Sequence, residues 1–81
     1  MALVRIFGGQ QFFNCDTIKI TPVSPGRWEV CYDDNRKFLV VGGRQSGGAS
    51  NEWFCYHPEF YGEAWLPCKS MVAAVRLGVQ Y

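Results

Sequence analysis

The strongest constraint on the fold is a repeated alternation of apolar and polar residues on both sides of a Pro-Gly pair. Residues 17–21 and residues 27–32 each place apolar side chains at every second position, which is the period of a β-strand with one buried side. Pro25 and Gly26 occupy the positions that a type II turn favours. The sequence therefore predicts a strand, a tight turn and a second strand.

Other short segments also have the character of strands. We expect them at residues 3–7, 10–13, 37–41 and 53–56. Gly8 and Gly9 are expected to form the turn of the first hairpin, and residues 33–35 the turn before a central strand. Residues 42–51, rich in glycine and serine, predict a long exposed loop. Pro58 predicts a short helical turn, because its fixed φ suits the first helical position.

Residues 70–81 decide the fold class, and they fit two interpretations. Ser70 could cap a helix whose valines recur at helical spacing, whereas residues 73–81 also alternate as a strand would. We favour the strand, because valines are unfavourable in so short a helix. The sequence thus predicts a mainly β fold, a small single-domain antiparallel sheet or barrel with one short helical turn. The alternative is an α+β fold with a C-terminal helix on an antiparallel sheet.

Size and composition favour one soluble domain. The chain has 81 residues and a mass of 9.2 kDa, which suits a single compact domain over residues 1–81. Its 48% hydrophobic and 19% charged residues exclude disorder. No apolar run approaches the roughly 18 to 20 residues that cross a bilayer, and the first residues do not resemble a signal peptide. We expect a cytoplasmic protein that does not associate with membranes.

The residues that could support catalysis or metal binding are few. The four cysteines form no Cys-x-x-Cys pair, so the usual spacing of a structural zinc site is missing. Cys55 and His57 would share one face of a strand with their Cβ atoms roughly 7 Å apart, which is long for a Cys–His couple. We expect no enzyme activity, cofactor or metal, although the sequence leaves metal binding by Cys55 and His57 open.

Residues 52–65 combine acidic and aromatic side chains and contain no Lys or Arg. Adjacent rings in an extended segment point to opposite sides, so some aromatic surface should face water. Exposed rings beside carboxylates suit docking onto a basic protein surface, with the rings as anchors. The expected partner-binding residues are Glu52, Trp53, Tyr56, Glu59, Tyr61, Glu63 and Trp65, with Trp53 and Trp65 as the anchors.

A second set of residues would suit nucleic acid. Small β-barrels stack bases on exposed rings and hold phosphates with cations, and the candidate cations are Arg27, Arg36, Lys37 and Arg44. However, the net charge is only +1, and residues 45–68, which hold six of the thirteen aromatic residues, contain no Lys or Arg. We therefore rank binding of single-stranded nucleic acid below protein binding.

In its length, its β-hairpin series over residues 17–41 and its acidic aromatic segment, the chain resembles the small anti-CRISPR proteins that phages and mobile elements encode. The resemblance implies a non-enzymatic inhibitor that blocks a basic, nucleic-acid-handling surface of a CRISPR-Cas complex in the cytoplasm of a bacterial host. The leading hypothesis is thus a protein-interaction module. The alternative is a small β-barrel that binds single-stranded nucleic acid. The sequence identifies neither the partner nor the oligomeric state.

Overall fold

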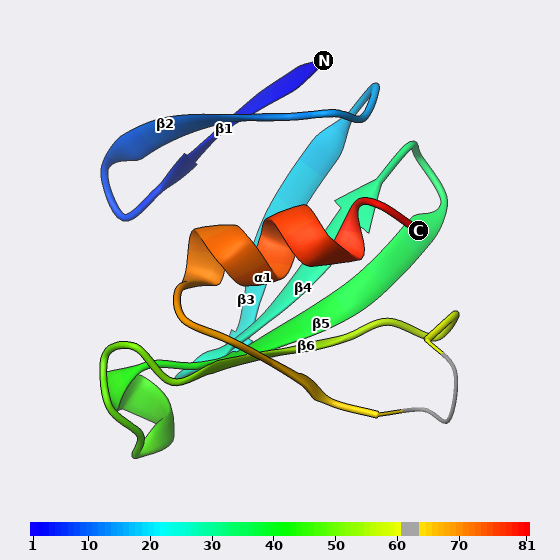
Figure 1. Ribbon diagram of the computed structural model, residues 1–81. Coiled ribbons are helices and arrows are strands. Elements are labelled where there is room, and N and C mark those ends of the chain that lie inside the picture. Colours follow the sequence, from blue (N-terminus) through cyan, green and yellow to red (C-terminus); the bar gives the residue numbers. More distant parts are fainter. Residues whose placement is uncertain (61–63) are drawn as a thin grey trace.

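A computed structural model describes residues 1–60 and 64–81, which form two antiparallel sheets and a short C-terminal helix (Figure 1). The N-terminal hairpin consists of β1 (Ala2–Ile6) and β2 (Gly9–Phe13). The larger sheet has the order β3-β4-β5-β6-β7, and its strands are β3 (Ile18–Ser24), β4 (Arg27–Tyr32), β5 (Arg36–Gly42), β6 (Trp53–Tyr56) and β7 (Leu66–Cys68). A 3₁₀ turn, η1 (Arg44–Ser46), follows β5, and α1 (Met71–Gly78) ends the fold. The predicted mainly β fold is confirmed.

The turn and the strands predicted between residues 17 and 41 are present. Gly26 has a φ of 76°, which a type II turn needs at its second central position, and the turn joins β3 to β4. Val30 and Tyr32 of β4 are buried on one face, as the alternation predicts. β5 lies between β4 and β6 and is thus a central strand. Pro22 does not end β3, because this strand lies at the sheet edge and a bulge follows the proline.

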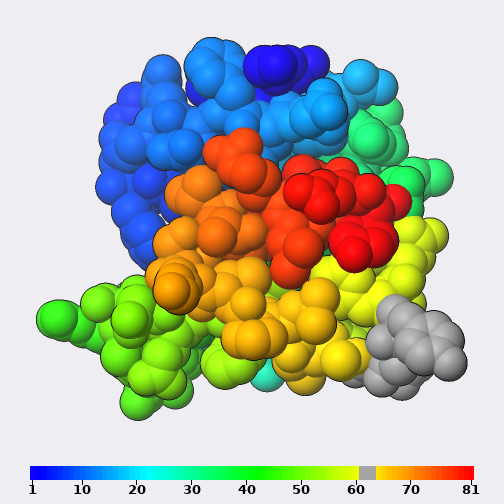
Figure 2. Space-filling model, viewed as in Figure 1, coloured from blue at the N-terminus to red at the C-terminus, as the bar shows by residue number. Residues whose placement is uncertain are grey.

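The fold has two layers with the core between them. The hairpin and α1 together cover one face of the larger sheet (Figure 1), and their side chains pack against each other in the space-filling view (Figure 2). The buried hydrophobic residues come from all of these elements: Ala2, Ile6, Phe13, Cys15, Val30, Tyr32, Phe38, Val40, Trp53, Cys55, Phe60, Met71, Ala74 and Val75. We call the covered side the inner face of the larger sheet.

The preference for a strand over residues 73–81 is wrong, because α1 occupies most of this segment. Ser70 is the N-cap, and its Oγ accepts a hydrogen bond from the Ala73 N–H at 3.0 Å. The buried face of α1 consists of Met71, Ala74, Val75 and Gly78, at the i, i+3, i+4, i+7 spacing of a helix. Packing against the sheet thus outweighs the low helix propensity of valine. Within residues 1–60 and 64–81, no helix is long and apolar enough to span a bilayer.

One smaller expectation needs correction, and one strand was not expected. The first hairpin turns at Phe7 and Gly8, whereas Gly9 already pairs with Ile6 in the ladder. The short turn expected at Pro58 is present, and the Phe60 N–H closes it by donating a hydrogen bond to the His57 carbonyl at 2.9 Å. The sequence also gave no sign of β7, because Leu66–Cys68 is short and contains a proline.

Candidate functional site

Trp53, one of the two predicted anchors, is buried at 4% exposure and cannot act as a water-facing anchor. In β6 the side chains of Trp53 and Cys55 point to the inner face, so Phe54 and Tyr56 point to the other. The Trp53 indole Nε1–H donates a hydrogen bond to the Ser50 carbonyl at 3.0 Å, which satisfies its one donor. The expectation that Trp53 faces water is therefore wrong.

The predicted acidic side chains do not gather around the rings in the described part of the chain. Glu52 precedes β6 and Glu59 follows it, so they lie at opposite ends of that strand. Glu59 forms an ion pair with Arg36, and Glu52 accepts a long hydrogen bond from the Ala49 N–H at 3.4 Å. Tyr61 and Glu63 lie outside the described residues. Residues 1–60 and 64–81 thus assemble no acidic aromatic surface.

Trp65 and Tyr56 do lie on an accessible surface, the outer face of the larger sheet, opposite α1. Trp65 is 42% exposed, and its ring packs against the half-buried Tyr56 with centroids 5.1 Å apart. Phe54, which the sequence did not single out, is 39% exposed on the same face and pairs with Pro67 of β7. We define the outer sheet face by the side chains that alternation and register place there: Lys19, Thr21, Arg27, Glu29, Cys31, Lys37, Leu39, Val41, Phe54, Tyr56, Trp65 and Pro67.

Strand pairing brings cations to these rings. Arg27 pairs with Val41, which pairs with Phe54 across β5, and these three line a hollow of about 330 Å³ with Trp65. Lys37 is exposed on the same face and pairs with Cys31. Cations and rings that are far apart in the sequence are therefore neighbours in the fold. Their separation along the chain no longer argues against nucleic-acid binding.

The other two predicted cations lie elsewhere. Arg36 sits over the Tyr32 ring at 5.4 Å from its centroid and is paired with Glu59. Arg44 belongs to η1 and is exposed at the rim of a pocket between the hairpin turn, the sheet and the start of α1. The four candidate cations are thus divided among three places, and only Arg27 and Lys37 share the outer sheet face.

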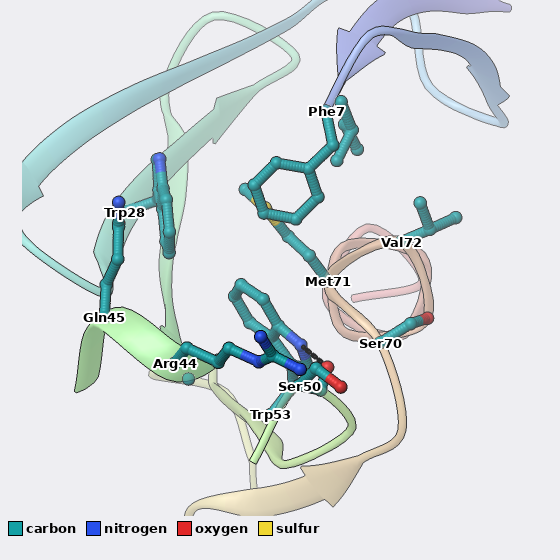
Figure 3. A pocket seen from close by; sticks show the side chains of 12 residues that line it. Phe7, Trp28, Arg44, Gln45, Ser50, Trp53, Ser70, Met71 and Val72 are labelled. Atoms are coloured by element: carbon teal, nitrogen blue, oxygen red, sulfur yellow. Dashed lines mark hydrogen bonds between the residues drawn. The ribbon is translucent and has the colours of Figure 1, made fainter. Parts of the chain in front are cut away.

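We call the pocket beside Arg44 the Trp53 pocket (Figure 3), and its volume is about 430 Å³. Its rings are Phe7, Trp28 and Trp53, with centroids 5.5 to 6.2 Å apart. The lining is completed by Ile6, Gly42, Gly43, Arg44, Gln45, Ser50, Ser70, Met71 and Val72. Glycine is required at position 43, because a Cβ there would lie 2.8 Å from the Trp53 ring. The loop after β5 can therefore lie directly against the indole.

Cys55 and His57 are both buried, at 0% and 2% exposure. Burial raises the pKa of the Cys55 thiol to about 12, so the thiol stays protonated at neutral pH. His57 is buried among aromatic rings, and burial lowers the pKa of its imidazole. Its Nδ1 accepts from the Glu59 N–H at 3.0 Å, so Nε2 carries the proton and donates to the Tyr32 hydroxyl at 2.7 Å. No cluster of three metal-binding side chains is found in residues 1–60 and 64–81.

Sequence reasoning missed Phe7, Trp28 and Phe54. Phe54 could have been found from its neighbour, because burial of Trp53 in a strand sends the next side chain to the opposite face. No local signal could have joined Phe7 to Trp28, since Phe7 lies in the hairpin turn and Trp28 in the larger sheet. Comparison of this chain with protein-family models, curated proteins and solved structures finds no match.

Proposed function

We propose that this protein is a non-enzymatic binding module that takes single-stranded nucleic acid onto the outer sheet face. The observation that carries the proposal is the shared hollow of Arg27, Phe54 and Trp65, in which a cation and two part-exposed rings meet. Rings stack bases of any sequence, and neighbouring cations hold the phosphates between them. Tyr56 and Trp65 from one predicted set and Arg27 and Lys37 from the other thus share one surface.

The charges of the outer sheet face suit a weak, salt-sensitive interaction. Among the described residues it carries Lys19, Arg27 and Lys37 against the carboxylate of Glu29. Three phosphate contacts on a single strand correspond to a slope of about −2 in a plot of log affinity against log salt concentration. Each stacked base contributes about 1 to 3 kcal/mol, so rings rather than charges supply most of the affinity.

A protein partner is the second candidate for the same face. Leu39 and Val41 lie half-buried between the rings and the cations, and Pro67 is exposed beside Phe54. Apolar side chains with a polar rim are typical of protein-binding patches. In that case, inhibition of a CRISPR-Cas complex would use this same face. Either activity suits a reducing cytoplasm, since the four cysteines Cys15, Cys31, Cys55 and Cys68 are free thiols.

The proposal is tested by fluorescence anisotropy with a labelled polythymidine strand of about 12 nucleotides, within the usual site sizes of small β folds. Wild-type protein should bind with a salt slope of about −2. Trp65→Ala and Phe54→Ala should each weaken binding about 5- to 150-fold, and Arg27→Gln should reduce the slope by about 0.7.

Matched controls come from the hairpin, which lies on the other side of the sheet. Phe12→Ala removes a ring that is 60% exposed, and Arg5→Gln removes an exposed cation, both away from the outer sheet face. If the polythymidine strand binds on the outer sheet face, neither control should change its affinity by more than about twofold. Absence of binding at low salt would refute the nucleic-acid proposal and leave protein docking as the use of this face. Equal losses in Phe12→Ala and Trp65→Ala would refute the assignment to the outer sheet face.

A further inference from the structure

The Trp53 pocket plays no part in the function proposed above, because it lies on the inner side of the sheet, between the hairpin, η1 and α1. We propose that it binds a small planar aromatic carboxylate, with the ring of the ligand packed on the accessible rings of Phe7 and Trp28 and its acid group on Arg44. The volume of about 430 Å³ lies within the range of roughly 300 to 1,000 Å³ that is usual for small-molecule sites.

Phe7 holds an exposed ring over this pocket at the expense of backbone strain. Its φ is 50°, a left-handed conformation that bulky residues rarely adopt, and the ring is 73% exposed. The ring nevertheless reaches Trp28 at 6.2 Å and Trp53 at 5.9 Å between centroids. Burial does not explain why phenylalanine occupies position 7, because its side chain is mostly exposed to water. The turn itself would favour asparagine, which adopts a left-handed φ more readily. Strain of this kind gathers at binding sites, where a ring must stand in one place.

The ring arrangement suits a flat ligand. Trp53 is held in place by burial and by its hydrogen bond to Ser50, so it forms a rigid support beneath Phe7 and Trp28. Trp28 is inclined to Trp53 by 38°, and Phe7 stands at 86° to Trp28. A planar ligand could therefore stack with an offset on one of Phe7 and Trp28 and meet the other edge to face, the two geometries that aromatic pairs prefer.

Arg44 determines the charge of the ligand. Figure 3 shows its side chain extending toward Ser50 at the pocket, and Arg44 forms no salt bridge within residues 1–60 and 64–81. None of the described lining residues is acidic, so a cationic ligand would meet the guanidinium without a carboxylate to balance it. Guanidinium binds carboxylate through two parallel hydrogen bonds. The pocket therefore favours an aromatic anion over the ammonium ligands that ring clusters otherwise attract.

The test is an NMR titration of the protein with indole-3-acetate, following the indole N–H signals of the three tryptophans. The signals of Trp28 and Trp53 should shift and saturate with a dissociation constant of about 1 mM or below, an ordinary efficiency for a ligand of that size. Trp65 should not move, because it lies on the outer sheet face. The neutral analogue indole-3-acetamide should bind about fivefold more weakly to the wild type.

Two variants separate the parts of the site. Arg44→Gln should make acid and amide bind equally, whereas Arg27→Gln, the same change outside the pocket, should leave the preference intact. Phe7→Asn should weaken both probes about fivefold or more while the protein stays folded, because asparagine adopts left-handed φ readily. Phe12→Ala should change neither affinity.

Saturable shifts of Trp28 and Trp53 with preference for the acid support the proposal. Shifts that do not saturate, an equal affinity for acid and amide, or full binding by Phe7→Asn would each overturn it. These results are independent of polythymidine binding, which depends on Arg27 and Trp65 rather than on Arg44 and Phe7.

Discussion

Replacing Gly78 by alanine should destabilise the protein, although Gly→Ala in an exposed helix stabilises by about 1 kcal/mol. Gly78 is the last residue of α1 and lies buried against the sheet. Its φ is outside the left-handed region, so alanine could adopt the same backbone conformation. A Cβ placed there would overlap Cε2 and Cζ of Phe38 and lie 2.6 Å from Cδ2. The steric contact with Phe38, and not the lost backbone freedom of glycine, therefore decides whether Gly78→Ala lowers or raises the free energy of unfolding.

The magnitude follows from how little the Phe38 ring can move. Phe38 is 2% exposed, and its ring is held by Tyr32 at 5.6 Å and by the stacked imidazole of His57 at 5.5 Å between centroids. Forcing an extra methyl group into a packed core costs about 1 to 3 kcal/mol. Subtracting the propensity gain of about 1 kcal/mol leaves a net loss of up to about 2 kcal/mol. For a domain of this size, 1 kcal/mol lowers the melting temperature by about 4 to 8 °C.

Urea and thermal unfolding of four proteins measure this effect: the wild type, Gly78→Ala, Phe38→Leu and the double variant. In the Phe38→Leu background the ring is gone, so Gly78→Ala should be neutral or stabilising, with a coupling energy of at least about 1 kcal/mol. Gly9→Ala is the matched control, because the nearest atoms to its Cβ lie at 3.7 Å and its φ is ordinary. A Gly78→Ala protein that is more stable than the wild type would show that α1 does not pack on Phe38 as described.

Three further predictions concern buried or strained groups. Burial lowers the pKa of His57 in the folded state, so the unfolded chain binds the proton more readily; stability is complete above the unfolded pKa of about 6.5 and is lost as pH falls below it. Urea unfolding between about pH 7.5 and 5 should show this loss in the wild type and a flatter profile in His57→Gln, and equal profiles would contradict a neutral buried imidazole. Because burial raises the pKa of Cys55 to about 12, iodoacetamide at about pH 8 should label Cys31, on the outer sheet face, well before Cys55, as mass spectrometry of the native protein can show. Early labelling of Cys55 would mean that β6 opens readily. Phe7→Asn should raise the free energy of unfolding by about 0.5 to 1 kcal/mol, because asparagine tolerates the left-handed φ at this position and little buried area is lost. A melting temperature below that of the wild type would show that Phe7 does not strain the backbone.

The sequence alone determined the parts of the fold that depend on neighbouring residues. The turn at Pro25 and Gly26, the alternation in β4 and the bounds of β6 were all predictable, because turn chemistry and strand period act within a few residues. Ser70 was recognised as a possible N-cap for the same reason. What could not be read locally was whether the segment after Ser70 would use its helical or its alternating pattern.

The tertiary structure decided the rest through pairing between distant residues. The choice of helix over strand after Ser70 depended on a sheet face that α1 could cover. The placement of Arg27 beside Phe54 depended on two strand registers, and the placement of Phe7 over Trp53 depended on how the hairpin packs on the sheet. Composition shows which rings and charges a chain possesses, but side chains far apart in sequence become neighbours only when hydrogen-bonded strands and a buried core bring them together.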